Sequence, residues 1–231
     1  MKGLLEVRSD LASASAVSLN PAGTSSQPIG LTSKRLADIV LALSGIVLLA
    51  PLLIICYVAT VIASPGPAFF GHRRVGFKGK HFDCLKFRTM VPDSAERLRN
   101  LLESDPAAAA EWIATRKLRN DPRVTAIGAI LRKSSLDELP QFWNVLRGEM
   151  TLVGPRPPLP YELEQYGPYE MLRLRGKPGL TGTWQVYGRS RVTFQEMIEM
   201  DIAYLEQQSI WQDIKLIFLT VPVMIFARGG G

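Results

Sequence analysis

The sequence is short of the residues that build common metal and disulfide frameworks. Its 231 residues include two cysteines, Cys56 and Cys84, and two histidines, His72 and His81. Two cysteines exclude a disulfide framework and a zinc ribbon, and two histidines argue against a histidine-based metal site. A hard metal ion held by carboxylates remains compatible with the composition.

Several catalytic signatures are also missing. The chain has no Walker A motif, no dinucleotide-binding G-x-G-x-x-G, no G-x-S-x-G nucleophile elbow and no internal repeat. Hydrophobic residues make up 47% of the chain and charged residues 21%, which excludes wholesale disorder. The net charge of +6 favours an anionic partner, whether a phosphorylated substrate, a membrane surface or nucleic acid.

One long apolar run stands out near the N-terminus. Residues 1–33 are rich in Ser, Ala and Gly and are predicted to form a disordered tail rather than a signal peptide. From Leu36 to Ala63 the only charged residue is Asp38, so this run is a membrane-segment candidate. A simple transmembrane anchor and a re-entrant helix are the two alternatives.

Two features favour the re-entrant alternative. Pro51 lies in the middle of the run, where it removes a helical hydrogen bond and kinks the helix. Both flanks are basic, with Lys34 and Arg35 before the run and six Lys or Arg residues between 73 and 88 after it. Because positive flanks mark the cytoplasmic side, the helix is expected to enter, bend and leave by the same face.

The rest of the chain predicts a mostly helical α+β domain with a small β-hairpin. The hairpin is expected over residues 75–88, and residues 184–187 look strand-like. Possible capping pairs, Asp93 with Glu96 and Thr193 with Glu196, predict helix starts. The last helix, from Ser209, carries Trp211 and could lie in the membrane interface or pack in the core.

The adjacent carboxylates Asp137 and Glu138 are the candidates for chemistry. At a helix start they would sit near free N–H groups, which keep a nucleophile or an Mg²⁺ ligand ionised. The alternative is structural, because Ser135-x-x-Glu138 also fits a capping box, although Pro140 would then fall inside the helix.

Five arginines lie beside prolines and glycines, in predicted loops. Rigid loops that carry Arg suit bidentate phosphate recognition, whereas a single arginine is usually only a solvated charge. Five in such settings favour a phosphate-handling site: Arg88, Arg123, Arg156, Arg175 and Arg189.

Taken together, the motifs resemble those of the bacterial sugar transferases, the monotopic polyprenyl-phosphate phosphoglycosyl transferases. The resemblance covers roughly residues 31–228, and the motifs are very specific only as a set. They are Lys34-Arg35-x-x-Asp38, Lys86-Phe87-Arg88-Thr89-Met90, Asn120-Asp121-Pro122-Arg123, Asp137-Glu138-Leu139-Pro140-Gln141, residues 144–150, Val153-Gly154-Pro155-Arg156-Pro157 and Lys177-Pro178-Gly179-Leu180-Thr181-Gly182.

The resemblance implies an activity. Such enzymes transfer a sugar-1-phosphate from a UDP-sugar to undecaprenyl phosphate, release UMP, and begin the assembly of an exopolysaccharide or another glycoconjugate. It implies that Asp137 is the nucleophile, that Glu138 is a metal-site or acid/base partner, and that Mg²⁺ assists, with both carboxylates near the metal. Lys177 and Gln185 join the five arginines as expected substrate contacts, and residues 184–189 look like those of members that handle glucose or galactose.

The resemblance also implies a place in the cell. The chain is expected to be monotopic in the bacterial inner membrane, with a re-entrant helix at residues 34–66 broken near Pro51 and a catalytic domain, residues 67–231, on the cytoplasmic face. Lys34, Arg35, Asp38 and Pro51 are the residues expected to define that re-entrant helix. Nucleic acid is not an expected partner of such an enzyme, and a homo-oligomer is left open. Two hypotheses compete with this one: a non-enzymatic, membrane-anchored basic module that binds nucleic acid or anionic lipid, and a membrane-bound phosphohydrolase.

Overall fold

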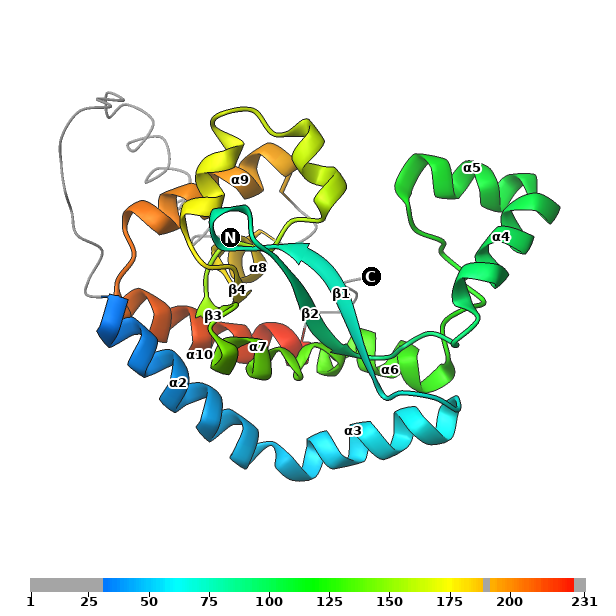
Figure 1. The fold of residues 1–231 in the computed structure, drawn as a ribbon, viewed down its shortest axis with the longest axis horizontal. Coiled ribbons are helices and arrows are strands. Elements are labelled where there is room, and N and C mark those ends of the chain that lie inside the picture. Colours follow the sequence, from blue (N-terminus) through cyan, green and yellow to red (C-terminus); the bar gives the residue numbers. More distant parts are fainter. Residues whose placement is uncertain (1–30, 189–191, 227–231) are drawn as a thin grey trace.

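The fold places a small hairpin and a set of short helices above a long bent helix (Figure 1). A computed structural model describes residues 31–188 and 192–226. The helices are α2 (Leu31–Leu48), α3 (Ala50–Ala63), α4 (Ser94–Ser104), α5 (Pro106–Thr115), α6 (Ala126–Lys133), α7 (Gln141–Arg147), α8 (Thr183–Tyr187), α9 (Phe194–Glu206) and α10 (Ile210–Phe226). The strands are β1 (Phe69–Val75), β2 (His81–Phe87), β3 (Thr151–Val153) and β4 (Gly179–Thr181), and four 3₁₀ turns complete the chain: η1 (Phe77–Gly79), η2 (Leu136–Glu138), η3 (Pro160–Gln165) and η4 (Glu170–Arg175).

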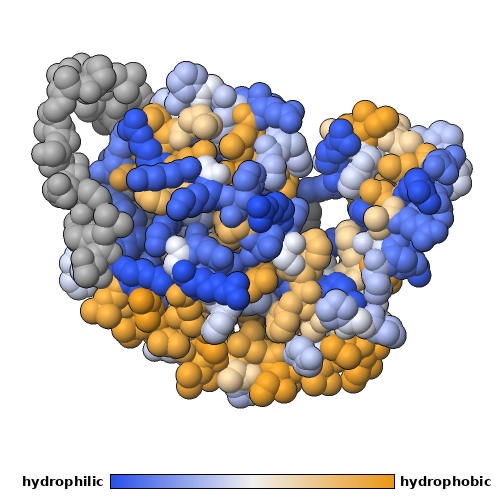
Figure 2. Space-filling model, in the orientation of Figure 1, coloured by the Kyte–Doolittle hydropathy of each residue, from blue (hydrophilic) through white to orange (hydrophobic). Residues whose placement is uncertain are grey.

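The apolar run forms two helices with a sharp bend between them. α2 and α3 meet at Leu49 at an angle of 65°, and Pro51 occupies the first turn of α3, where its missing N–H needs no partner. No single helix in the described parts of the chain is long and apolar enough to cross a membrane. The two helices of this bent pair reach that length and apolar composition only together. Figure 2 shows its apolar side chains gathered along one edge of the molecule, below a largely hydrophilic surface.

Three charged or polar groups fasten the start of α2 to the domain. Lys34 pairs with Asp213 of α10, and the two guanidinium ends of Arg35 donate to the carbonyls of Val145 and Leu146 at 2.5 and 2.7 Å. The buried carboxylate of Asp38 accepts from the Thr151 hydroxyl and the Leu152 backbone N–H. The first turn of α2 lies within the segment predicted as a tail, whose residues 1–30 are outside the described residues.

The hairpin is present, but it is longer than expected on its N-terminal side. β1 and β2 pair antiparallel from Phe69↔Phe87 to Val75↔His81, so the first strand starts six residues before Val75. The turn falls at η1, where Lys78 and Gly79 both take a positive φ. The sequence pattern does not predict the first part of β1, which contains Gly71-His72-Arg73-Arg74. A strand exposed along most of its length shows little apolar alternation.

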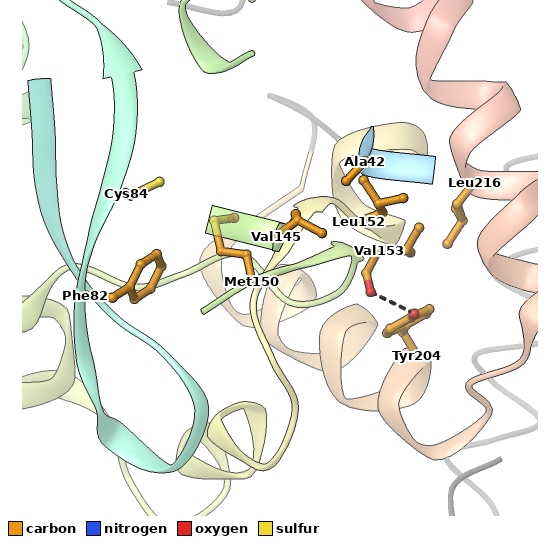
Figure 3. Packing of buried hydrophobic residues seen from close by; sticks show 9 residues of the cluster. All are labelled: Ala42, Phe82, Cys84, Val145, Met150, Leu152, Val153, Tyr204 and Leu216. Carbon is orange, nitrogen blue, oxygen red and sulfur yellow. Dashed lines mark hydrogen bonds between the residues drawn. The ribbon is translucent and has the colours of Figure 1, made fainter. Parts of the chain in front are cut away.

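The main core lies where α2, α7, α10 and the hairpin converge. Figure 3 shows the side chains that pack there: Ala42, Phe82, Cys84, Val145, Met150, Leu152, Val153, Tyr204 and Leu216. Asn144 of α7 joins the hairpin to this core, because its amide accepts from the Leu85 N–H and donates to the Asp83 carbonyl. A buried amide with both ends satisfied fixes α7 against β2.

The strand expected at residues 184–187 is wrong. The chain pairs earlier, with β4 running parallel to β3, and then turns into α8 after Gly182. The ladder ends there because β3 is followed by Gly154 and Pro155, and proline has no N–H to continue it.

The predicted helix starts had mixed outcomes. Thr193 and Glu196 form the predicted capping box of α9, and Ser209 accepts from the Gln212 N–H at the start of α10. Asp93 makes no cap to α4 and instead holds Arg97, four residues along, so the Asp93–Glu96 pair is wrong. α4 and α5 form an arm that projects from the body in Figure 1.

Candidate active site

The two candidate carboxylates lie in η2, between α6 and α7. Ser135 adopts a positive φ of 57° just before the turn, and its side chain makes no cap within the described chain. The capping-box alternative for Glu138 is therefore wrong. Leu136 packs against a small cluster of Cys56, Phe87 and Leu131, which anchors the turn below β2.

Lys86 of β2 joins the two carboxylates. Its Nζ lies 2.6 Å from Glu138 Oε1 and 3.7 Å from Asp137 Oδ2. The Glu138 side chain is 36% exposed, whereas that of Asp137 is 10% exposed. One carboxylate thus faces the open side of the site, and the other is held in a drier place beside the same ammonium group.

The pKa values of both Asp137 and Lys86 are raised, for different reasons. Burial raises the pKa of Asp137, Glu138 adds to that rise, and Lys86 and Arg132 oppose it. Burial opposes the charge of Lys86, but Glu138 and Asp137 outweigh it and raise the pKa of this amine. The expectation that a helix start keeps Asp137 ionised is corrected, because α7 begins only at Gln141 and side-chain cations supply that stabilisation.

α6 brings Arg132 within electrostatic reach of Asp137. Gly128 allows this packing, since a Cβ there would lie 2.0 Å from the Thr89 carbonyl oxygen. The Arg132 Nε then donates to Thr89 Oγ1 at 2.8 Å, and its guanidinium interacts with the charges of Asp137 and Asp121. A buried carboxylate that interacts with both Lys86 and Arg132 suits attack on an anionic centre, since both cations can offset charge on phosphoryl oxygens.

More basic residues lie on or near the face of the β1–β2 hairpin that carries Lys86. Arg74 Nη2 lies 3.4 Å from His72 Nδ1, and Arg74 Nη1 donates to the Pro157 carbonyl at 3.1 Å. Arg156 pairs with Glu162 at 3.1 Å. Burial, then Arg74, Lys86 and Arg156, lower the pKa of His72 to about 4, so its ring is neutral at pH 7.

Besides Arg156, which pairs with Glu162, two more of the predicted phosphate contacts are engaged in protein contacts. Arg88 donates to the carbonyls of Ser64 and Pro65, which ties the end of α3 to the hairpin. The buried Arg123 forms a bidentate pair with Asp121, at 2.7 and 2.6 Å, and stacks on Trp112. Arg123 still acts on the charge of Arg132, so it borders the site.

The other predicted contacts are spread more widely. Arg175 is exposed in η4, and Lys177 lies near Arg35 and Gly148, at the opposite end of α7 from the carboxylates. Gln185 donates to the Leu180 carbonyl at 3.4 Å, and its buried Oε1 has no partner among the described residues. Arg189 lies outside the described residues.

The carboxylates can be tested as magnesium ligands. Residues 31–188 and 192–226 contain no group of three or more His, Cys, Asp or Glu side chains placed to hold a metal ion. Mg²⁺ commonly binds through one or two carboxylates together with substrate phosphates and water. Asp137 and Glu138 fit that mode, in which the substrate completes the shell.

The sequence pattern indicates the two carboxylates but not most of the residues around them. In the sequence, Lys86 belongs only to a basic flank and a motif, and no role is predicted for Arg74 or Arg132. For Lys86, the usable signal was its register on β2 opposite Phe70, which places it on the same face as His72 and Arg74. Arg132 has no comparable signal, because its position depends on how closely α6 approaches Thr89.

Comparisons with known proteins give the family that this chain resembles and several similar proteins. The family model described as bacterial sugar transferase matches residues 29–227. The chain is 44% identical over 203 residues to the exopolysaccharide production protein ExoY of Rhizobium meliloti, covering 88% of this chain and 90% of the relative.

Two longer relatives carry more explicit names. The UDP-galactose-lipid carrier transferase of Erwinia amylovora is 49% identical over 196 residues, which cover 85% of this chain and 41% of the relative. The UDP-glucose:undecaprenyl-phosphate glucose-1-phosphate transferase of Escherichia coli is 41% identical over 196 residues, covering 81% of this chain and 39% of the relative. The chain thus corresponds to less than half of these two proteins.

Proposed function

The chain belongs to the bacterial sugar transferase family, and from this premise we propose which reaction it catalyses. It is a phosphoglycosyl transferase that moves a sugar-1-phosphate from a UDP-sugar to undecaprenyl phosphate, for exopolysaccharide or related glycoconjugate assembly. The names of the relatives favour galactose or glucose as the sugar. The observation that carries the proposal is Asp137, buried beside Lys86 and Arg132.

Asp137 acts as the nucleophile in the proposed reaction. One of its carboxylate oxygens attacks the phosphorus that bears the sugar, and the bond from this phosphorus to the bridging oxygen breaks. UMP leaves with the bond electrons. An oxygen of undecaprenyl phosphate then attacks the same phosphorus, and cleavage of the bond to Asp137 restores the carboxylate. Two displacements replace a single difficult one.

The neighbouring residues hold the charges in this scheme. Lys86 keeps Asp137 ionised and faces the phosphoryl oxygens, and Arg132 offsets their charge from the α6 side. Glu138 holds the Lys86 ammonium in place through the 2.6 Å contact. Mg²⁺, when bound by Asp137, Glu138 and the diphosphate, supplies further charge neutralisation.

The membrane arrangement is part of the proposal. The bent pair α2–α3 would dip into the bacterial inner membrane and return, leaving the catalytic domain on the cytoplasmic face as a monotopic protein. Its support is the 65° bend, the apolar surface of both helices and the basic flanks. The fastening of α2 through Lys34, Arg35 and Asp38 then sets the depth of the active site relative to the lipid phosphate.

A single-substrate experiment tests the covalent step. With UDP-galactose or UDP-glucose and no lipid, the intact protein should gain the mass of one hexose phosphate and release UMP. Asp137→Asn should lose the adduct and at least about 1,000-fold in turnover, because an amide cannot attack phosphorus. Glu138→Gln is the matched variant that keeps the nucleophile. It should still form the adduct, more slowly.

The same variant has a defined effect on stability. Because the pKa of Asp137 is raised on folding, its contribution to stability is lost as pH rises through the folded pKa. At pH 7 Asp137→Asn should therefore leave the melting temperature unchanged or raise it.

A mass that never rises in the wild type, or normal turnover in the Asp137→Asn variant, would leave direct transfer to the lipid as the reaction to pursue.

Topology is tested separately. Cysteine labels at Ser26 and Ser94 should react from the same side in intact cells, and both native thiols are buried, which limits background. Pro51→Leu restores a helical N–H and favours a straight helix; the 28 residues from Leu36 to Ala63 would then span about 42 Å. Opposite accessibility of the two labels in the wild type would exclude the re-entrant arrangement.

A further inference from the structure

The two faces of the hairpin treat arginine differently. Successive residues of β1 point to opposite faces, so Arg73 and Arg74 lie on different sides. Arg73 is 59% exposed and has its own carboxylate, Asp83, at 3.7 Å on the same face. Arg74 is half-buried on the other face, beside His72 and on the side of Lys86.

On the face of the hairpin that carries His72, Arg74 and Lys86, the covered face, Arg74 has no carboxylate in direct contact among the described residues. The charged groups that act on Arg74 or His72 are Lys86, Arg156, Glu138 and Glu162. Glu138 is held by Lys86 and Glu162 by Arg156, which leaves the charge of Arg74 to the neutral ring of His72 and the Pro157 carbonyl. Half-burying a cation with only neutral partners costs free energy, and this cost is tolerated where an anion binds.

The donors on this face suit a phosphate group. Two of the five N–H groups of Arg74 serve the His72 and Pro157 contacts, which fix the guanidinium plane. His72 accepts from Arg74 through Nδ1, so the neutral ring carries its proton on Nε2 as a further donor. A guanidinium oriented in this way offers the fork geometry that phosphate oxygens accept.

We propose that Arg74, oriented by His72, binds the phosphate of the leaving nucleoside monophosphate. This inference rests on the proposed function, in which the attacked phosphorus lies at Asp137 and the second phosphorus of the diphosphate departs. The second phosphate then lies along the covered face of the hairpin, on the side of Lys86 away from Asp137. Arg74 binds this phosphate in the substrate and keeps it after the bond breaks, while the sugar phosphate stays on Asp137.

Binding of UMP to the purified full chain in detergent tests the assignment without using turnover. Arg74→Gln should weaken UMP binding by about 10- to 100-fold, the usual worth of a charge-assisted pair. Arg73→Gln is the matched control, with the same chemistry one residue away on the opposite face, and should stay within about twofold of wild type. Equal affinity for UMP in the wild type and in Arg74→Gln would overturn the proposal.

A second pair of variants guards against misfolding, since Arg74 also holds the Pro157 carbonyl. His72→Gln keeps an acceptor for Arg74 and should retain UMP affinity within about threefold, whereas His72→Leu should weaken it by about 3- to 10-fold. Equal affinities for these two variants would remove the positioning role of His72. A wild type that binds UMP through Arg74 but transfers no sugar phosphate would sink the proposed function and leave the phosphate site standing.

Discussion

Lys34 and Lys86 each meet carboxylates, yet the two sites differ in how completely their polar groups are satisfied. Lys34 contacts Asp213, the Tyr204 hydroxyl and the Val153 carbonyl, and the Tyr204 hydroxyl lies 2.5 Å from the second oxygen of Asp213. Lys86 contacts Glu138 closely and Asp137 at 3.7 Å, with Glu138 partly exposed. At the first site the polar groups bind one another. At the second site some carboxylate oxygens remain available to a ligand.

That difference separates a structural clamp from a reactive site. The Lys34–Asp213 pair joins α2 to α10 across 179 residues of sequence and uses its hydrogen-bonding capacity within the protein. At the other site, burial raises the pKa of Asp137 against the pull of Lys86, so folding holds a carboxylate where its charge is disfavoured. In the proposed reaction, this carboxylate keeps its oxygens for the attack on phosphorus instead of using them within the protein.

Removing the Lys86 charge should change turnover far more than breaking the Lys34–Asp213 clamp does. Lys86→Met takes away a group that lowers the pKa of Asp137, so this pKa should rise further. The acidic limb of the pH–rate profile should move to higher pH, and turnover at pH 7 should fall about 100-fold or more. Lys86→Arg keeps the charge and should leave the limb near its wild-type position. An unmoved limb in Lys86→Met would show that Lys86 does not set the ionisation of Asp137.

Breaking the clamp should cost stability instead of chemistry. The side chains of Lys34 and Asp213 are 17% and 12% exposed, so solvent screens the pair only in part. Lys34→Met leaves Asp213 with Tyr204 alone and should cost about 2–3 kcal/mol, which lowers the melting temperature by about 4–12 °C. Turnover per folded molecule should stay within about threefold. A loss of turnover with unchanged melting would place Lys34 in the catalytic site.

How far the sequence predicts these two sites depends on the range of the interactions. Adjacent signals were readable: Asp137-Glu138 beside Pro140, the proline that follows the bend at Leu49, and the capping box at Thr193. The contacts that give the sites their character join distant segments, such as Lys86 to Glu138 over 52 residues and Lys34 to Asp213 over 179. No local pattern encodes such pairs.

The two failures at the strands have the same origin. β1 was missed in part because its residues are exposed and polar, so apolar alternation was weak. Residues 184–187 include two aromatic residues and one β-branched residue, which predicts a strand. A strand needs a partner, however, and β3 ends at Val153, shortly before Pro155, without supplying one. Pairing is a tertiary event, and propensity alone does not locate it.

The smallest expected effect comes from the hydroxyl at the centre of the clamp. Tyr204 is buried, and burial followed by the charge of Asp213 strongly raises its pKa, so the hydroxyl stays protonated at any ordinary pH. Tyr204→Phe removes this group while the Lys34–Asp213 pair remains, and the ring still packs against Val153 in the core (Figure 3).

The cost of Tyr204→Phe should be about 1 kcal/mol, roughly the net worth of one hydrogen bond, because Lys34 can still neutralise Asp213. Thermal melting of the variant beside Lys34→Met gives the comparison, and the double variant shows the coupling between the two residues. Additive losses would mean that the hydroxyl serves the Val153 carbonyl, 2.9 Å away, rather than the ion pair. A loss as large as that of Lys34→Met would instead make the hydroxyl the centre of the clamp, with the ion pair depending on it.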